Sequence, residues 1–188
     1  VRPDFPEVYL HAIKRGLLVT IFSNGTLVTE KVADFLADHP PALVEISVYG
    51  HTKATYEAVT RIPGSFEKCR AGIARLMERG VPVKLKTMAL TVNRHEIPDM
   101  ERFAAELGTT FKFDGFLNPR VDCGANRNGD LQLSAEQVLA LDLQNPSRIK
   151  EFREFFERSV KPRADEGITA QSEAIAQRGE QALRARRV

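Results

Sequence analysis

Short apolar segments alternate with helical patterns along this chain, and no other feature of the sequence constrains the fold as strongly. Each segment has the length of a strand, and the first is apolar almost throughout, which is typical of a strand buried on both faces. The segments are residues 17–22, 43–49, 83–90 and 110–116. Strands that alternate with helices form right-handed crossovers. We therefore expect an α/β fold in which about four parallel strands are covered by helices.

The helices are predicted from apolar side chains at helical spacing and from the residues at helix ends. The first five are expected at residues 6–15, 29–39, 53–59, 65–79 and 93–107. Thr29, Ser65 and Asn93 are predicted to begin three of them, because short polar side chains cap helices. Glycines are predicted to end three helices, at Gly16, Gly80 and Gly108; the last two are the helices that Ser65 and Asn93 begin.

The C-terminal part of the chain has a different character. Residues 121–130 are rich in Gly, Asn and Arg, which indicates either a disordered bridge or an active-site loop. Ser134–Gln137 has the spacing of a capping box, and further helices are predicted at residues 146–160 and 168–187. The phenylalanines of residues 146–160 are expected to pack. We predict two domains, a (βα) unit at 1–130 and a helical extension at 131–188.

Composition excludes several classes of function. The 188 residues carry a formal charge of +2, which is too balanced to predict nucleic-acid binding. No apolar run approaches the roughly 18 residues that span a bilayer, and no signal peptide is visible, so we expect a cytoplasmic protein without a membrane partner. Cys69 and Cys123 are too far apart for a compact metal or redox motif. They are interpreted as a buried residue and a loop thiol.

Polar residues follow the predicted strands where parallel strands place their ligands. Ser23 and Asn24 follow the first strand, although Asn-Gly is also an ordinary turn former. Lys84 and Lys86 share one face of the third strand, where they either supply positive potential to a cavity or meet solvent. Further candidates follow or end strands, and their ordinary roles are caps and loop hydrogen bonds: Asn93, Asp114, Asn118 and Arg120.

The block from Arg2 to about Leu141 resembles the core of radical S-adenosylmethionine (radical SAM) proteins of the kind that carry a C-terminal SPASM extension. The matching segments, in order, are residues 2–5, 23–27, 47–50, 63–66 and 80–87, followed by Asn93 with Glu96. The resemblance implies an open half-barrel, that is, a partial (βα) barrel of about four parallel strands. It also implies that Ser47 contacts a ribose hydroxyl. This sequence departs from the family at Tyr49, where Asp is common, and at Thr60, beside Arg61, where a basic residue is common.

The resemblance implies two cofactors for a full-length parent protein, S-adenosylmethionine and a [4Fe-4S] cluster that together yield a 5′-deoxyadenosyl radical. The cluster needs a CxxxCxxC loop, which two separated cysteines cannot provide. We therefore expect no cofactor bound to this chain and assign no catalytic or metal-ligating residue. The implied cofactor-binding residues are Ser23, Asn24, Ser47, Tyr49, Arg61 and Lys86. The implied substrate-binding residues are Lys84, Asn93, Asp114, Asn118 and Arg120.

The functional prediction is a fragment of a radical SAM oxidoreductase that modifies a peptide or matures a cofactor, with a small-molecule or peptide substrate. The sequence is compatible with a fragment, a proteolysed product, a gene model started at an internal valine codon and a degenerate family member that has abandoned the chemistry. The alternative is a non-catalytic α/β binding or assembly domain that forms a homodimer through exposed strand edges. A complete (βα)8 aldolase or isomerase is disfavoured, because four strands are half of what closure requires.

Overall fold

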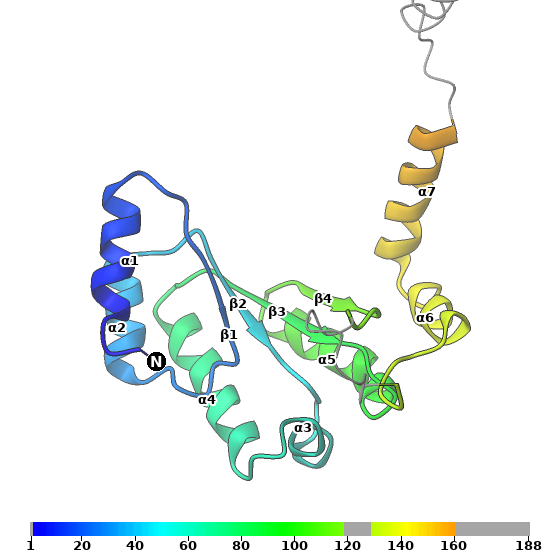
Figure 1. Ribbon diagram of the computed structural model, residues 1–188, viewed down its shortest axis with the longest axis horizontal. Helices are drawn as coiled ribbons and strands as arrows, with labels where there is room; N and C mark the ends of the chain where they lie inside the picture. The colour runs from blue at the N-terminus through cyan, green and yellow to red at the C-terminus, as the bar shows by residue number, and fades with distance from the viewer. Residues whose placement is uncertain (1, 119–128, 161–188) are drawn as a thin grey trace, which may run out of the picture. The chain divides into compact units, whose positions relative to one another are not determined.

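The fold is built on one sheet of four parallel strands, as the sequence predicts. The computed structural model describes residues 2–118 and 129–160. Within them the strands are β1 (Thr20–Ser23), β2 (Leu43–Ser47), β3 (Val83–Met88) and β4 (Phe111–Asp114). They lie side by side in sequence order, and every neighbouring pair is parallel (Figure 1). Such an open sheet leaves β1 and β4 as edges among the described strands.

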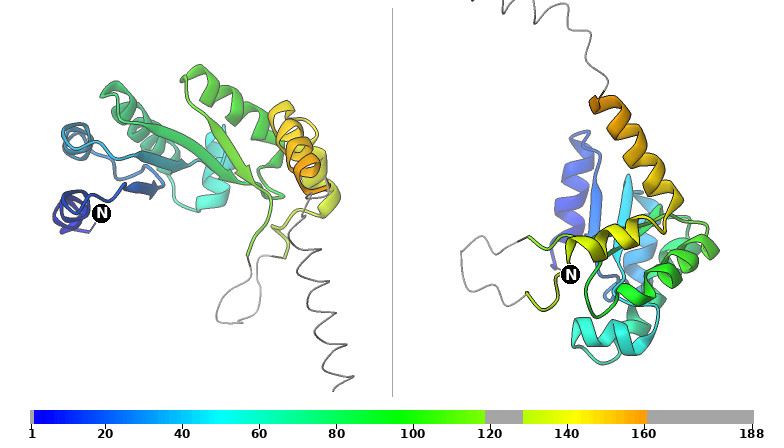
Figure 2. Two further views of the ribbon diagram at one scale, coloured as in Figure 1. Left: turned by 90° about the horizontal axis from the view of Figure 1, so that it is seen from above. Right: turned by 90° about the vertical axis from the view of Figure 1, so that its right-hand side faces the viewer.

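Helices separate the strands and cover one face of the sheet. Between β1 and β4 lie α2 (Glu30–Asp38), α3 (Lys53–Thr60), α4 (Ser65–Glu78) and α5 (Ile97–Glu106). A 3-10 turn, η1 (Arg94–Glu96), precedes α5, and α1 (Phe5–Lys14) precedes the first strand. Figure 2 shows α4 and α5 on the same side of the sheet. The helices α6 (Ala135–Asp142) and α7 (Pro146–Val160) follow the sheet in the chain.

The two faces of the sheet differ because side chains alternate along each strand. Val44 and Ile46 of β2 and Leu85 of β3 are buried beneath the helices. The opposite side, which we call the open face, carries Phe22, Glu45, Ser47, Lys84, Lys86 and Lys112, by strand register and alternation. On β4, Phe113 is buried while Lys112 and Asp114 are exposed, so the incomplete burial predicted for that strand is confirmed.

The prediction that the first strand is buried on both faces was wrong. Leu17 and Leu18 precede β1 and are 60% and 92% exposed, and Phe22 within it is 65% exposed. An apolar run signals burial only if other parts of the chain pack on both of its faces, and β1 is an edge among the described strands, with Phe22 exposed on its open face. The sequence pattern does not distinguish the edge of a partial barrel from its centre.

Several helix ends form as predicted. The Thr29 hydroxyl accepts a hydrogen bond from the Val32 amide (3.3 Å) at the start of α2. Ser134 and Gln137 exchange side-chain-to-amide hydrogen bonds, which confirms the capping box. Gly16, Gly80 and Gly108 follow helices with φ near +70° to +78°, as C′ residues do.

Two predicted caps were wrong. Helix α4 begins after Gly64, which has a φ of 76°, and the Ser65 hydroxyl bonds to Thr60 instead of capping. Asn93 precedes η1 but makes no side-chain cap, because its amide is used by other backbone groups. The residue type at a helix start does not reveal whether its side chain forms hydrogen bonds with other groups instead of capping the helix.

A close approach of two glycines fixes α4 against the loop after β1. A Cβ atom added to Gly72 would lie 2.1 Å from the Gly25 carbonyl oxygen. The side chain of Cys69, one turn earlier, lies beside Gly25 as well and is fully buried, as the sequence predicts. The helix therefore holds the β1–α2 loop in position at the carboxyl end of the sheet.

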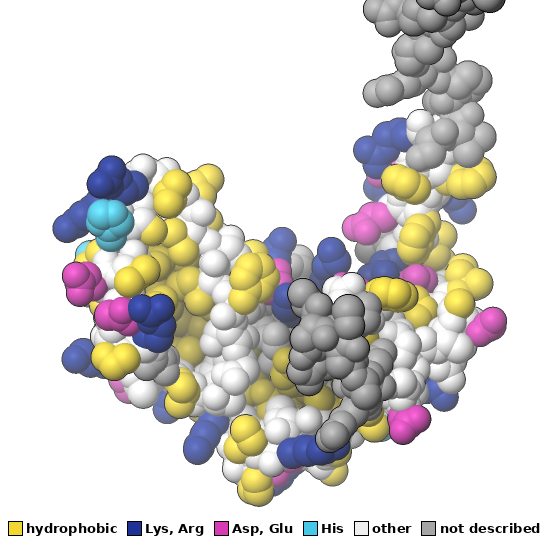
Figure 3. Space-filling model, in the orientation of Figure 1, with side chains coloured by type: hydrophobic (Ala, Val, Ile, Leu, Met, Phe, Trp, Pro, Cys, Tyr) yellow, Lys and Arg dark blue, Asp and Glu magenta, His cyan; other side chains and the backbone are white. Residues whose placement is uncertain are grey.

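The chain forms two compact units, Val1–Val138 and Leu139–Val188. The domain division after residue 130 stays a prediction. In the second unit, Phe152, Phe155 and Phe156 of α7 are each more than half exposed, so the packing expected of them is not seen (Figure 3). None of the helices in the described part of the chain has the length and apolar character needed to cross a bilayer.

Candidate functional site

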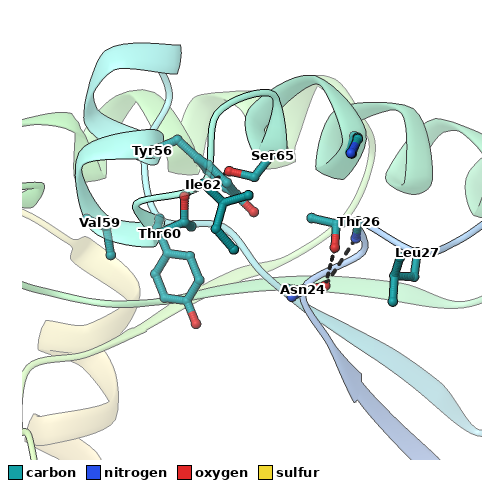
Figure 4. A pocket seen from close by; sticks show the side chains of 10 residues that line it. Asn24, Thr26, Leu27, Tyr56, Val59, Thr60, Ile62 and Ser65 are labelled. Carbon is teal, nitrogen blue, oxygen red and sulfur yellow. Dashed lines mark hydrogen bonds between the residues drawn. The ribbon is translucent and has the colours of Figure 1, made fainter. Parts of the chain in front are cut away.

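A pocket of about 550 Å³ lies at the carboxyl ends of β1 and β2, beneath the connection from α3 to α4. Its volume is in the range of ordinary ligand sites. The loops after β1 and β2, helix α3 and the start of α4 form its wall (Figure 4). The lining residues are Asn24, Thr26, Leu27, Tyr49, Tyr56, Val59, Thr60, Ile62, Ser65 and Lys68.

One part of the wall is aromatic and aliphatic. The rings of Tyr49 and Tyr56 meet edge to face with their centroids 5.9 Å apart. Leu27 and Ile62 are each more than half exposed, although each lines the pocket. Aromatic rings and branched side chains form a surface that suits the flat face of a heterocyclic base.

Polar groups at the pocket leave hydrogen-bonding capacity for a ligand. The Oδ1 atom of Asn24 accepts from the amide (3.1 Å) and hydroxyl (2.9 Å) of Thr26, as expected for a turn after a strand. Its Nδ2 atom makes no hydrogen bond with any residue that the structure describes. The Thr60 and Ser65 hydroxyls lie 2.8 Å apart and share one hydrogen bond, so one of the two protons is left to donate elsewhere.

Tyr56 carries a buried hydroxyl without a hydrogen-bond partner. Its side chain is 1% exposed, and its Oη atom makes no hydrogen bond within the described part of the chain. Burial and the neighbouring Cys69 thiol raise the pKa of Tyr56, and burial also raises the pKa of Cys69. Both groups are therefore neutral at physiological pH and do not act as a base or a thiolate nucleophile.

Glu96 anchors the segment that carries Tyr49 and Tyr56. Its carboxylate is 6% exposed and accepts hydrogen bonds from the amides of His51 (2.7 Å) and Thr52 (3.0 Å). It also accepts from the hydroxyls of Thr52 and Thr55, each at 2.6 Å. Burial opposes the charge, but these four donors outweigh it and lower the pKa of Glu96. The charged carboxylate fixes the N-terminus of α3.

Asn93 adds a second link to the same loop. Its side chain is fully buried, and its Nδ2 atom donates to the carbonyls of Tyr49 (3.1 Å) and Met88 (3.0 Å). Its Oδ1 atom accepts from the Leu90 amide at 2.8 Å. Because the amide is occupied by backbone groups, Asn93 supports the pocket from behind. It lies outside the pocket lining.

The open face carries a second group of polar residues. The Lys86 ammonium lies 2.8 Å from the Glu45 carboxylate and 4.6 Å from the centroid of the Phe22 ring. Lys84 and Lys112 lie on the same face in neighbouring register positions and are exposed. The prediction that Lys84 and Lys86 share a face is confirmed.

The structure brings only some of the predicted site residues together. Of the cofactor candidates, Asn24 and Tyr49 line the pocket, whereas Ser47 and Lys86 lie on the open face. Ser23 is on the helix-covered face by strand register, and its hydroxyl accepts from the Gly25 amide (3.1 Å). It therefore lies on the opposite face of the sheet from Ser47 and Lys86. Arg61 has a left-handed φ of 56° at the end of α3 and is exposed.

The remaining substrate candidates are dispersed. Asp114 ends β4, and its carboxylate accepts from the Phe116 amide (3.1 Å), while Asn118 is exposed. Arg120 and Cys123 lie outside the described residues.

Sequence reasoning missed several residues that build the pocket, chiefly Tyr56, Ser65, Lys68 and Glu96. Tyr56 stands on a short helix that gave a weak pattern. In the sequence, Glu96 is noticeable only as one position of the family resemblance. Its role in the structure could not be predicted, because its hydrogen-bond partners lie more than 40 residues away in the chain.

The pocket fits the adenosyl part of S-adenosylmethionine. A purine has flat apolar faces with a polar edge, and a ribose has hydroxyls, which match an aromatic wall beside the free donors of Asn24 and the Thr60–Ser65 pair. The described residues do not fit an iron–sulfur cluster. They contain Cys69 as a buried free thiol and no group of three or more metal-ligating side chains.

A family model and several curated relatives match this chain. The model of the Radical SAM superfamily matches residues 1–104. The chain is 30% identical over 118 residues to "AdoMet-dependent heme synthase" of Methanosarcina barkeri, which covers 63% of this chain and 34% of the relative. It is 29% identical over 108 residues to "PqqA peptide cyclase" of Xanthomonas campestris, covering 57% and 29%. The chain thus spans about a third of the length of these relatives.

Solved structures show the same fold. A hexahistidine-tagged form of anSMEcpe with bound AdoMet matches with a TM-score of 0.62 at 16% identity over 85% of this chain and 42% of that one. "Native anSMEcpe with bound AdoMet and Cp18Cys peptide" matches with a TM-score of 0.55 at 17% identity over 66% and 35%. At such identities the likeness concerns the fold alone.

Proposed function

The chain belongs to the Radical SAM superfamily, and from that premise we propose that it provides the adenosyl pocket of a radical SAM oxidoreductase that modifies a peptide or matures a cofactor. The observation that carries the proposal is the position of the pocket. It lies where the carboxyl ends of parallel strands β1 and β2 meet, which is where α/β sheets bind nucleotides.

Different residues of the pocket would contact different parts of the ligand. Tyr49, with Leu27 and Ile62, would hold the base through its faces, since buried aromatic and aliphatic area drives such contacts. Asn24 Nδ2 and the Thr60–Ser65 hydroxyl pair would contact the polar atoms of the base or ribose. Asn93 and Glu96 would keep the β2–α3 loop in the binding conformation. Ser47, Arg61 and Lys86 remain proposed contacts for parts of the cofactor beyond the pocket.

The open face is the proposed substrate side. Lys84, Lys86 and Lys112 give it positive charge, which Glu45 and Asp114 offset in part. A carboxylate-bearing small molecule or a peptide would be attracted by such a surface. One relative is named as a peptide cyclase and one similar structure holds a peptide, which supports this choice of substrate class.

Association of two copies through the edges of β1 and β4 is a separate proposal, tested by measuring molecular mass in solution.

The chain itself is proposed not to generate radicals. S-adenosylmethionine supplies the radical chemistry of this superfamily only in combination with a [4Fe-4S] cluster. The two cysteines of this sequence, 69 and 123, do not form the CxxxCxxC loop, so the cluster ligands are not provided by these 188 residues. We derive no step through the cluster.

Calorimetric titration with S-adenosylhomocysteine tests the proposal. Wild-type protein is expected to give saturable heat, and Ile62→Trp is expected to abolish it, because Ile62 lines the pocket and is exposed enough to accept an indole without disturbing the core. The matched control is Leu18→Trp, at a residue 92% exposed and away from the pocket. Absence of saturable heat with the wild type would favour a non-catalytic binding or assembly domain instead.

A further inference from the structure

A stripe of exposed phenylalanines runs along helix α7. Phe152, Phe155 and Phe156 are 54%, 66% and 65% exposed. Phe155 and Phe156 follow Phe152 by three and four residues, so all three lie on one side of the helix, and half-buried Ile149 extends that side by one turn. We call these four residues the phenylalanine stripe. Large apolar side chains gathered on a surface indicate a face that another chain covers.

Charged side chains border the phenylalanine stripe on both edges, and each edge carries both signs. Arg153 and Glu157, four residues apart, lie along one edge, and Glu151 and Arg158, two turns apart, lie along the other. All four are exposed. Glu151, Arg153 and Glu157 form no ion pair with the residues that the structure describes. Their charges are therefore available to a partner that lies along α7.

The order of these charges is complementary to itself when the helix is reversed. In an antiparallel pair of identical helices related by a twofold axis, each edge faces the same edge of the other copy. With the axis beside Phe155, Arg153 faces Glu157 of the second copy, and Glu157 faces Arg153 of the second copy. On the other edge Glu151 faces Arg158 in the same reciprocal way. Every facing pair then joins opposite charges, with the phenylalanines of both copies between them.

From this complementarity we infer that α7 is a docking surface for a second copy of this chain, and that the two helices pair antiparallel. Helices α6 and α7 are joined by residues 143–145, so the preceding part of the chain meets α7 at its N-terminal end. Antiparallel pairing places these two connections at opposite ends of a pair about 22 Å long, whereas parallel pairing brings both to one end. Antiparallel helix dipoles also attract each other.

The size of the phenylalanine stripe sets the expected strength of the association. The exposed parts of six phenylalanine rings, three from each copy, amount to roughly 700 Å². Stable interfaces bury at least roughly 1,200 Å², so this one belongs with the weak, reversible interfaces. We expect a dissociation constant in the micromolar range, which makes the dimer depend on protein concentration.

Charge reversal along one edge tests the inference. Sedimentation velocity is measured from micromolar to millimolar concentration for the wild type, Arg153→Glu, Glu157→Arg and the double variant. Each single variant puts like charges in both contacts of that edge and should raise the dissociation constant about tenfold. The double variant exchanges the two charges and should restore the wild-type value. An equimolar mixture of the single variants should form a heterodimer, because one carries only acidic and the other only basic side chains on that edge.

Two matched controls make the same changes of net charge on the opposite side of α7. These are Lys150→Glu and Glu154→Arg, at exposed residues that lie away from the phenylalanine stripe. Both should leave the dissociation constant unchanged. Phe155→Ser should abolish the dimer, and the exposure of Phe155 means that the substitution leaves the fold intact.

Three results would overturn the inference. The first is a monomer at every concentration. The second is a dimer whose dissociation constant responds to none of the α7 variants, which would point to the edges of β1 and β4 instead. The third is a double variant that stays weak while the mixed single variants do not associate. Parallel helices would behave in this way, because their Arg153 would face Glu151 of the second copy.

Discussion

The Glu96 carboxylate accepts hydrogen bonds from both the amide and the hydroxyl of Thr52, at 3.0 and 2.6 Å, across 44 residues of sequence. This contact joins the 3-10 turn η1 before α5 to the start of α3. Because α3 carries Tyr56, Val59 and Thr60, the shape of the pocket depends on a carboxylate that is not part of it. Glu96 is a positioning residue in this account.

Replacing Glu96 with Gln should lower the stability of the protein by about 2–3 kcal/mol at pH 7, since hydrogen bonds to a charged group contribute more than neutral ones. The lowered pKa of Glu96 means that its contribution is full above the ordinary carboxyl value near 4.3 and is lost as the pH falls through the lower folded-state value. Denaturant unfolding of wild type and Glu96→Gln from pH 7 to pH 3 measures this. The difference should shrink below about pH 4.

The control for this measurement is Glu78→Gln, at an exposed residue near the end of α4. It should change stability by less than about 0.5 kcal/mol. A Glu96→Gln protein with wild-type stability at pH 7 would show that the four hydrogen bonds do not hold the loop.

Gly72→Ala should destabilise the protein by roughly 2 kcal/mol or more, although glycine to alanine within a helix ordinarily stabilises by about 1 kcal/mol. The new methyl group would lie 2.1 Å from the Gly25 carbonyl oxygen, so the helix or the β1–α2 loop must move. The midpoint of urea unfolding measures the effect, with Ala74→Ser on the exposed side of the same helix as control. An increase in stability would mean that α4 does not pack as closely as described.

Glu45 and Lys86 should be energetically coupled through their ion pair. Lys86 is 40% exposed and Glu45 22%, so the pair is screened by solvent, and a coupling of about 0.5–1 kcal/mol is expected. A double-mutant cycle with Glu45→Gln and Lys86→Met, followed by denaturant unfolding, gives this value. Phe22→Leu in both backgrounds separates the ring contact from the ion pair. A coupling of zero would contradict this expectation and would mean that the ion pair with Glu45 does not hinder Lys86 from binding a ligand.

Anaerobic reconstitution with iron and sulfide should leave this chain colourless. The described residues contain one cysteine, which is buried, and no metal-ligating cluster. Iron and sulfide content after desalting measures the result. About four irons retained per chain, with the broad visible absorption of a cubane, would mean that this sequence holds a cluster without the CxxxCxxC loop.

Much of the fold follows from local sequence signals. The alternation of strands with helices predicts the parallel sheet, and residues such as Thr29, Ser134 and Gly80 mark helix ends correctly because capping depends on neighbours in the chain. The exposure of Leu18 and Phe22 could not be predicted, since burial depends on what lies over the strand.

The site was less predictable than the fold. Asn24 was found because it follows a strand, and Tyr49 was found through the family resemblance. Ser23 and Asn93 also follow predicted strands, but their side chains face inward. Glu96 acts through partners that are more than 40 residues away in the sequence, and a single sequence carries no signal of those contacts. Strand ends therefore predict where a site lies more reliably than which side chains form it.

The central claim is that the pocket between Tyr49 and Ser65 binds an adenosyl group. A crystal structure of the protein soaked or grown with S-adenosylhomocysteine tests this claim most directly. We predict that the adenine lies between Tyr49, Leu27 and Ile62. Density for the ligand elsewhere, or an unliganded pocket at a concentration that saturates the calorimetric titration, would contradict the account.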